Sequence, residues 1–277
     1  MSLVILCQIL GIILLAIAGA KTGQILAQKP RAIWLGGFIL MMLPLLLIGL
    51  ARKLPQLEFM PPCLWLMAER SEFVVLAFLI PALLGIPAAL LPLPRQRLLV
   101  QVLGGLCVCS YSVFPFLMPA LHRASLQKLQ TSVDRDGVCL QGTGYTCGPS
   151  ASVTALHRLG VRAEEGDLAL TAHSSRYSGT PPDSLCVAID ELYGSQGVTT
   201  EFRYCATAEE LQLPAVALLK WGTMTDHYVA VLSCSTEEVV VGDPLHGKVK
   251  MPRATFDKRW RHCAIFFKRK SSSADRR

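Results

Sequence analysis

Charged residues are scarce in this 277-residue sequence, at 17% of the total, whereas soluble domains average about 25%. Residues 1–121 contain 8 Lys and Arg and 3 Asp and Glu. Four apolar stretches there contain none of these charges, and each approaches the roughly 20 residues that cross a bilayer: 3–20, 33–51, 73–93 and 98–121. The lack of ionisable groups argues against an ion path or proton relay. We therefore interpret residues 1–123 as a membrane anchor of about four spans.

Three functional signatures are also missing. The sequence has no phosphate-binding loop, which argues against ATP-driven transport by this chain alone. Cys107 and Cys109 lie in an apolar stretch without further ligands, so no metal site is expected. Residues 122–277 hold 19 Lys and Arg against 17 Asp and Glu, a net +2, and this balance does not suggest a surface for nucleic acid. We predict no cofactor, no metal and no nucleic-acid partner.

One polar, glycine-rich segment indicates chemistry: Gln141-Gly-Thr-Gly-Tyr-Thr-Cys147-Gly-Pro149. Cys147 stands where this turn gives way to a helix-compatible run, 150–159, which Gly160 closes as the residue after the helix. Unpaired N–H groups and the positive end of the helix dipole stabilise a thiolate at a helix N-terminus. Cys147 is therefore the candidate nucleophile.

A candidate general base and a carboxylate that could orient it follow Cys147 in the sequence. His227 opens the predicted strand 227–232, and Asp243 ends the next, 239–243. Two adjacent strands joined by a short turn can bring the imidazole and the carboxylate within hydrogen-bond reach, which gives a nucleophile, base and orienter. The Gln141 amide, across the glycine-rich turn, can donate to the developing oxyanion together with the Cys147 N–H.

Neighbouring residues of similar chemistry receive other roles. Asp226 points to the opposite strand face from His227, and His246 is a weaker rival base. Trp221, near a strand end, either lines the cleft or packs in the core, and we favour the core. The remaining thiols are expected to be small buried side chains: Cys186, Cys205, Cys234 and Cys263.

These motifs resemble a known family. Gln-x5-Cys-Gly, the His227-Tyr-Val-Ala-Val strand and Gly242-Asp-Pro are similar to the papain-like bacteriocin-processing peptidases, family thirty-nine of the cysteine peptidases, over residues 132–267. The resemblance implies catalysis by Cys147, His227 and Asp243 with Gln141 at the oxyanion. It also implies removal of leader peptides after a double glycine, often by a cytoplasmic domain fused to an export transporter. Thr146 departs from the family pattern, in which an acidic residue often precedes the nucleophile.

Composition divides the chain. A hydrophobic content of 52% and a mean hydropathy of +0.42 suit a membrane region followed by a soluble one. We predict an α+β papain-like domain over 124–270 after the all-α transmembrane bundle, and a disordered tail over 271–277. A helix should start with Thr180 as N-cap and Pro181 at its first position. Strands are predicted at 198–204, 215–221, 227–233, 239–242, 248–251 and 264–268.

The sequence thus predicts a multi-pass, membrane-anchored cysteine peptidase. Its partners would be a peptide or precursor-protein substrate, the lipid bilayer and a separate ABC-type exporter. Basic residues flanking the spans are tied at five on each side, so they do not set the orientation. The five thiols besides Cys147 in the soluble part lack framework spacing and favour the cytoplasmic side.

Three alternatives stay open at this point. The triad chemistry also suits a transglutaminase-like acyl transferase, which differs only in the accepting nucleophile. The domain could instead be a non-catalytic peptide-binding partner of an exporter. The first stretch, ending in Ala18-Gly19-Ala20, has a signal-peptide-like end, but no Lys or Arg precedes it, so we favour an uncleaved span.

Overall fold

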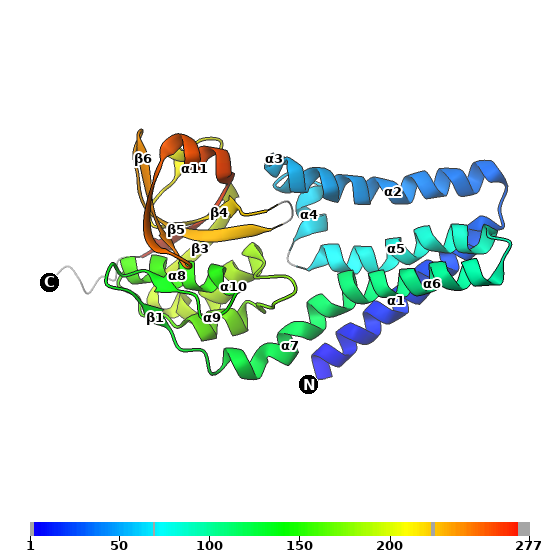
Figure 1. The fold of residues 1–277 in the computed structure, drawn as a ribbon, viewed down its shortest axis with the longest axis horizontal. Helices are drawn as coiled ribbons and strands as arrows, with labels where there is room; N and C mark the ends of the chain where they lie inside the picture. Colours follow the sequence, from blue (N-terminus) through cyan, green and yellow to red (C-terminus); the bar gives the residue numbers. More distant parts are fainter. Residues whose placement is uncertain (1–2, 69, 223–224, 271–277) are drawn as a thin grey trace. The chain divides into compact units, whose positions relative to one another are not determined.

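The computed structural model describes residues 3–68, 70–222 and 225–270. The tail predicted to be disordered, 271–277, lies outside the described residues. The chain divides into two units, Met1–Leu121 and His122–Arg277, and each is described by itself (Figure 1).

The N-terminal part of the chain contains four helices that are long and apolar enough to cross a membrane. The first three are α1 (Leu3–Ala27), α2 (Arg31–Lys53) and α5 (Ser71–Leu90). The fourth runs from α6 (Pro94–Val108) through a π-helical turn (Cys109–Val113) into α7 (Phe114–Leu126), and the short helices α3 (Pro55–Glu58) and α4 (Cys63–Met67) precede α5. The prediction of an all-α N-terminal region with about four long apolar helices is confirmed.

Small residues bring α1 and α5 close together. A Cβ atom added at Gly19 or Gly23 of α1 would collide with the backbone carbonyl of Phe78 or Ala82 in α5. Gly85 of α5 completes the crossing against Gly23. In lipid, helices gain little from burying apolar area and associate instead by close backbone approach, which small residues permit.

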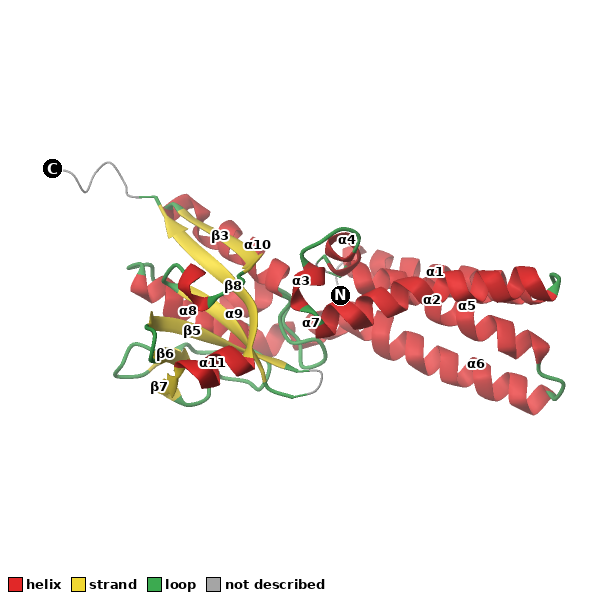
Figure 2. Cartoon of the chain, turned by 90° about the horizontal axis from the view of Figure 1, so that it is seen from above, coloured by secondary structure: helices red, strands yellow, loops and turns green. Residues whose placement is uncertain are grey.

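The second unit contains a six-stranded antiparallel sheet in the order β3-β8-β4-β5-β6-β7. All the predicted strands are present, and Figure 2 colours the strands yellow against the red helices. A separate small hairpin pairs β1 with β2. The bounds are β1 (Ser132–Val133), β2 (Cys139–Leu140), β3 (Val198–Tyr204), β4 (Ala215–Lys220), β5 (Asp226–Cys234), β6 (Glu238–Asp243), β7 (Gly247–Pro252) and β8 (Trp260–Arg269).

Helices cover both faces of the six-stranded sheet (Figure 1). One face carries α8 (Cys147–Arg158), α9 (Glu165–Thr171) and α10 (Pro182–Tyr193), and the other carries α11 (Arg253–Arg259). Short 3-10 turns, η2 (Gly194–Gln196) and η3 (Ala208–Glu210), join these elements. The core under α11 is apolar and fully buried around Phe256, Trp260 and Phe266. The predicted α+β domain, in which the helix that begins at Cys147 packs on an antiparallel sheet, is confirmed.

Local helix boundaries depart from prediction in two places. The helix predicted from residue 150 begins at Cys147, while Gly160 has a φ of +70°, which confirms its place beyond the helix end. The predicted N-cap at Thr180 is wrong, because α10 begins at Pro182 and Pro181 caps it. The Thr180 hydroxyl instead lies 2.7 Å from the Ser174 hydroxyl, and its carbonyl accepts a hydrogen bond from Tyr228.

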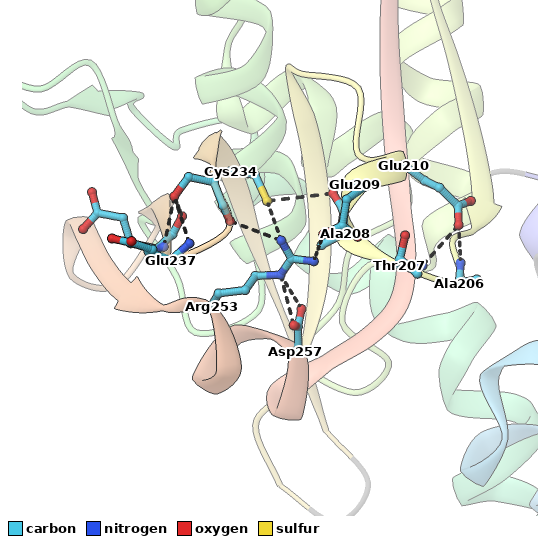
Figure 3. A network of polar contacts seen from close by, with 11 residues as sticks. Ala206, Thr207, Ala208, Glu209, Glu210, Cys234, Glu237, Arg253 and Asp257 are labelled. Atoms are coloured by element: carbon cyan, nitrogen blue, oxygen red, sulfur yellow. Dashed lines mark hydrogen bonds and ion pairs between the residues drawn. The ribbon is translucent and has the colours of Figure 1, made fainter.

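A partly buried arginine holds together the side of the sheet that carries α11 (Figure 3). Arg253 Nε donates to both carboxylate oxygens of Asp257, at 2.9 and 3.0 Å, and its other nitrogens reach Glu209 Oε1 at 2.8 Å and the Ser235 carbonyl at 3.2 Å. One side chain thereby ties α11 to η3 and to the turn between β5 and β6. This network belongs to the scaffold, not to the site described next.

Candidate active site

Cys147 is the first residue of α8 and is partly exposed, whereas the helix behind it is buried from Gly148 to Leu156. A Cβ at Gly148 would lie 3.1 Å from Leu185 and 3.4 Å from Tyr228. Glycine after the nucleophile therefore lets the start of α8 pack tightly between β5 and α10. This packing places the thiol at the rim of the domain with the helix N-terminus behind it.

His227 and Asp243 meet at one end of the sheet, as their strand positions predict. Ala230 of β5 pairs with Gly242 of β6, so the start of β5 lies beside the end of β6. His227 Nε2 lies 2.7 Å from Asp243 Oδ1, and both side chains are buried. The Leu245 N–H donates to the same carboxylate oxygen at 2.9 Å, which fixes the carboxylate in place.

The electrostatics of this pair favour the charged forms. Burial alone would lower the pKa of His227, but hydrogen bonds to Asp243 and Cys147 and the charges of both raise it from 6.5 to about 9. Burial alone would raise the pKa of Asp243, but hydrogen bonds from His227, the Leu245 N–H and His246 lower it from 3.8 to about 2. At neutral pH the site therefore holds an imidazolium beside a carboxylate.

The His227 ring can serve two partners at once. Asp243 occupies Nε2, which leaves Nδ1 as the nitrogen available to the Cys147 thiol. A thiol on one ring nitrogen and a carboxylate on the other form the arrangement that activates a cysteine nucleophile. The structure thus brings together three of the four residues that the sequence singled out.

Gln141 lies at the edge of the same cluster. Its backbone N–H donates to the Pro244 carbonyl at 2.9 Å, so the turn before α8 is tied to the residue after Asp243. Its Nε2 donates to the Thr143 carbonyl at 2.7 Å. Among the described residues its Oε1 is buried without a hydrogen-bond partner. The hydrogen bond to Thr143 uses one of the two Nε2 protons and leaves the other for a second acceptor. The role of the Gln141 amide as an oxyanion donor stays a prediction.

Two aromatic side chains near His227 have placements that local sequence does not reveal. Trp221 is 50% exposed, so the predicted core position is wrong. Its ring lies over His227 with the centroids 5.0 Å apart. His246 Nδ1 lies 3.0 Å from Asp243 Oδ2, so this second histidine shares the carboxylate. The glycine that follows Trp221 is a sequence signal for a turn, and a residue next to a turn is more often exposed than buried.

The other residues of similar chemistry lie in different settings. Asp226 accepts a hydrogen bond from Arg261 at 2.8 Å, away from the imidazole. Burial raises the pKa of Cys139 and of Cys186 to about 12 and also raises the pKa of Cys205. A raised thiol pKa means a protonated, unreactive side chain at neutral pH.

Sequence comparison places the chain in a family. Residues 135–272 match the sequence profile of the peptidase C39 family. A protein of Methanothermobacter marburgensis is 30% identical over 118 residues, which cover 43% of this chain and 78% of that protein. The chain belongs to the peptidase C39 family.

Three further proteins are similar to this member of the C39 family over about half of its length. A protein of Methanothermobacter thermautotrophicus is 27% identical over 130 residues, 47% of this chain and 87% of that protein. The peptidase domain of Streptococcus ComA, a bifunctional ABC transporter, matches with a TM-score of 0.42 and 20% identity over 47% of this chain and 96% of that domain. A double glycine motif protease from an AMS/PCAT transporter, solved with its leader peptide, has a TM-score of 0.41 and 17% identity over 51% and 93%.

Proposed function

We propose that the chain is a membrane-anchored cysteine peptidase that hydrolyses peptide bonds with Cys147, His227 and Asp243. The observation that carries the proposal is the double engagement of His227, whose ring bonds Asp243 at 2.7 Å and interacts with the Cys147 thiol. Membership of a peptidase family supports the reaction class. Four helices long and apolar enough to span a bilayer support the anchor.

The reaction follows from these positions. The Cys147 thiolate attacks the peptide carbonyl carbon, and the carbonyl oxygen becomes an oxyanion that accepts hydrogen bonds from the Cys147 N–H and the Gln141 amide. His227 gives its Nδ1 proton to the leaving amine as the C–N bond breaks, which leaves a thioester. The neutral imidazole then takes a proton from water, the hydroxide attacks the thioester, and the acid product leaves with the thiolate restored. Asp243 holds the ring through Nε2 in both halves of the reaction.

The proposed substrate is a peptide or precursor protein with a leader that ends in a double-glycine motif, as the family resemblance implies. The anchor would keep the site at the membrane surface, where a precursor could be met before a separate ABC-type exporter moves it. We propose the cytoplasmic side for the domain, because an exported domain with several spare thiols would risk wrong disulfides.

The decisive experiment uses the full chain in lipid nanodiscs and a synthetic peptide whose leader ends in Gly-Gly, with mass spectrometry of the products. We expect cleavage after the second glycine by the wild type and none by Cys147→Ala. Equal cleavage by both proteins, or binding without cleavage by both, would overturn the proposal. Added glycylglycine would reveal an acyl transferase, because the product would then carry the amine instead of water.

Placement needs its own measurement. Alkaline phosphatase, which is active only outside the cytoplasmic membrane, can be fused after Arg277. We expect no phosphatase activity from this fusion. A green fluorescent protein fusion at the same position should be fluorescent. Strong phosphatase activity would place the domain outside and favour exported peptides as substrates.

A further inference from the structure

A buried carboxylate lies beneath the turn that leads to the nucleophile. Glu165 is the first residue of α9, and its side chain is completely shielded from solvent. Both of its carboxylate oxygens accept a hydrogen bond from the backbone N–H of Gly142, at 2.9 and 3.2 Å. Gly142 directly follows Gln141, so the carboxylate holds the backbone next to the predicted oxyanion donor.

The same carboxylate also reaches the other end of the turn. The Thr146 and Ser150 side chains lie close enough to Glu165 to lower the pKa of its carboxyl group, and Thr146 directly precedes Cys147. The Thr146 hydroxyl accepts a hydrogen bond from the Thr143 N–H at 3.3 Å and donates one to the Thr143 carbonyl at 3.1 Å. The same carbonyl accepts a hydrogen bond from the Gln141 amide. One acidic group thus binds the turn at Gly142 and lies beside its other end at Thr146.

Neighbouring residues hold Glu165 and Gly142 in place. The Glu165 N–H donates to the Thr131 hydroxyl at 2.8 Å, and the Leu129 side chain lies against Gly142 on the same side. Burial raises the pKa of Glu165, while hydrogen bonds from Thr146, Gly142 and Ser150 oppose that rise. A carboxyl group taken out of water costs several kcal/mol unless it is well hydrogen-bonded. Burying a leucine at this position would cost less free energy than burying a carboxyl group. Stability alone therefore does not account for an acid here.

We propose that Glu165 is a positioning residue of the peptidase: it holds the turn from Gln141 to Thr146 so that the Gln141 amide and the Cys147 N–H converge on the oxyanion. The inference rests on the proposed peptidase function. Oxyanion donors act only when they lie about 2.7–3.1 Å from the place where the charge develops. Glu165 adds to the hydrogen bonds within the turn a support from outside it, through the Gly142 N–H.

The central test is Glu165→Gln in the full chain, assayed with a fluorogenic peptide ending in Gly-Gly-aminomethylcoumarin. The amide keeps the shape and one acceptor but loses the charge and the second acceptor. We expect kcat to fall about 10–100-fold with KM within about threefold, because the missing interaction acts in the transition state. The rate of Cys147 alkylation by iodoacetamide should stay at the wild-type value, since alkylation uses the thiolate but no oxyanion donor.

The neighbouring Glu164→Gln is the matched control. Glu164 is half-exposed and contacts only Arg162, at 3.7 Å, among the ion pairs of the described residues. Its kcat and alkylation rate should equal those of the wild type. If Glu165→Gln leaves kcat unchanged, or slows alkylation as much as turnover, the positioning role fails.

A double variant separates positioning from a general loss of structure. Gln141→Ala with Glu165→Gln should lose less kcat than the product of the two single losses, because the part of the positioning that acts through the Gln141 amide is already gone. Multiplied losses would overturn the inference. Should Glu165→Gln fail to fold, Thr146→Val, which removes one hydroxyl partner, should reduce kcat with unchanged alkylation, and Thr146→Ser should restore it. Failure of that rescue would also overturn the inference.

The outcome is distinguishable from failure of the proposed function. If the wild type and Cys147→Ala release the fluorophore equally, the peptidase proposal fails whatever Glu165 does. If the wild type turns over and Cys147→Ala does not, an unchanged Glu165→Gln rejects only the positioning role.

Discussion

The two units place the same kinds of residue in opposite ways. The helical unit holds most of the exposed large apolar side chains, such as Leu40 at 66% exposure, while the buried positions of α5 mix Ala77 and Ala82 with Leu83 and Ile86. In the peptidase domain the buried positions hold Phe256 and Trp260. Water drives large apolar groups inward, whereas lipid removes that drive and favours small residues at helix contacts. The contrast teaches that the helical unit has the residue distribution expected of helices in lipid, and the second unit that expected of a domain in water.

Polar groups differ between the units as well. The helical unit pairs Arg52 at the end of α2 with Glu72 at the start of α5, at 2.6 and 2.7 Å, so this pair joins two helix ends. The second unit instead buries Glu165, His227 and Asp243, which lie near Cys147 or the turn before it. Buried polar groups lower stability unless they are fully hydrogen-bonded. Their clustering in one part of the domain therefore indicates a candidate catalytic site. The predictions below test whether the units respond separately.

The largest expected effect is the loss of turnover in His227→Ala. This change removes the group that takes and returns the proton, so kcat should fall by at least about 10³-fold. Helical content and detergent solubility should match the wild type, since the change touches only the soluble unit. Circular dichroism and the fluorogenic peptide assay measure the two responses. Turnover within tenfold of the wild type would remove His227 from the mechanism.

Gln141→Ala should have the next largest effect. Loss of one oxyanion hydrogen bond should cost about 10²-fold in kcat. The alkylation rate of Cys147 should be retained, because His227 and Asp243 are untouched. A wild-type kcat in this variant would leave the peptidase in place and remove Gln141 from the oxyanion site.

In the helical unit, Gly23→Leu should break the contact between α1 and α5. The added side chain would collide with the Ala82 carbonyl, and overpacking typically costs about 1–3 kcal/mol. Gly11→Leu is the matched control, since no described atom lies within 4 Å of a Cβ built there. Unfolding by SDS, followed by circular dichroism, should begin at lower SDS only for Gly23→Leu. Equal curves for the two variants would contradict the close helix crossing.

Arg253→Ala tests the scaffold of the soluble unit away from the site. It removes the bonds to Asp257, Glu209 and the Ser235 carbonyl, and we expect about 1–3 kcal/mol of destabilisation. Arg162→Ala, whose side chain is 94% exposed, should stay within about 0.5 kcal/mol. Urea unfolding monitored by tryptophan fluorescence compares them. Turnover per folded molecule should be unchanged in both variants, and a selective loss in Arg253→Ala would tie that network to catalysis.

The smallest expected effect is a change in pH dependence. The pKa of His227 is raised to about 9, so its stabilising charge is complete below 6.5 and is lost as pH rises through about 9. The pKa of Asp243 is lowered to about 2, so its contribution is present above 3.8 and is lost as pH falls through about 2. Turnover should fall as pH rises past about 9. In Asp243→Asn that fall should begin at a lower pH, and an unmoved limb would contradict the assignment.

Much of the architecture follows from local patterns. Long apolar stretches predicted the four helices, and runs of β-branched residues predicted every strand of the main sheet, because both signals repeat within one element. The boundary of α10 was missed by one residue, because Thr180 bonds Ser174 and Tyr228 in place of capping the helix. The two-residue strands β1 and β2 and the seven-residue helices α9 and α11 were not predicted, because two residues show no strand alternation and two turns show little of the helical period.

The sequence by itself determined the residues that carry the chemistry. Cys147 begins a helix after a glycine-rich turn, and His227 and Asp243 stand at the ends of consecutive strands, so their meeting follows from strand pairing alone. Tertiary structure alone decided that Trp221 covers His227, that His246 shares Asp243, and that the carboxylate of Glu165 lies beneath Gly142. The physical reason is range: helix and strand periods are set between near neighbours in the chain, whereas these contacts join segments that only packing of the whole domain brings together.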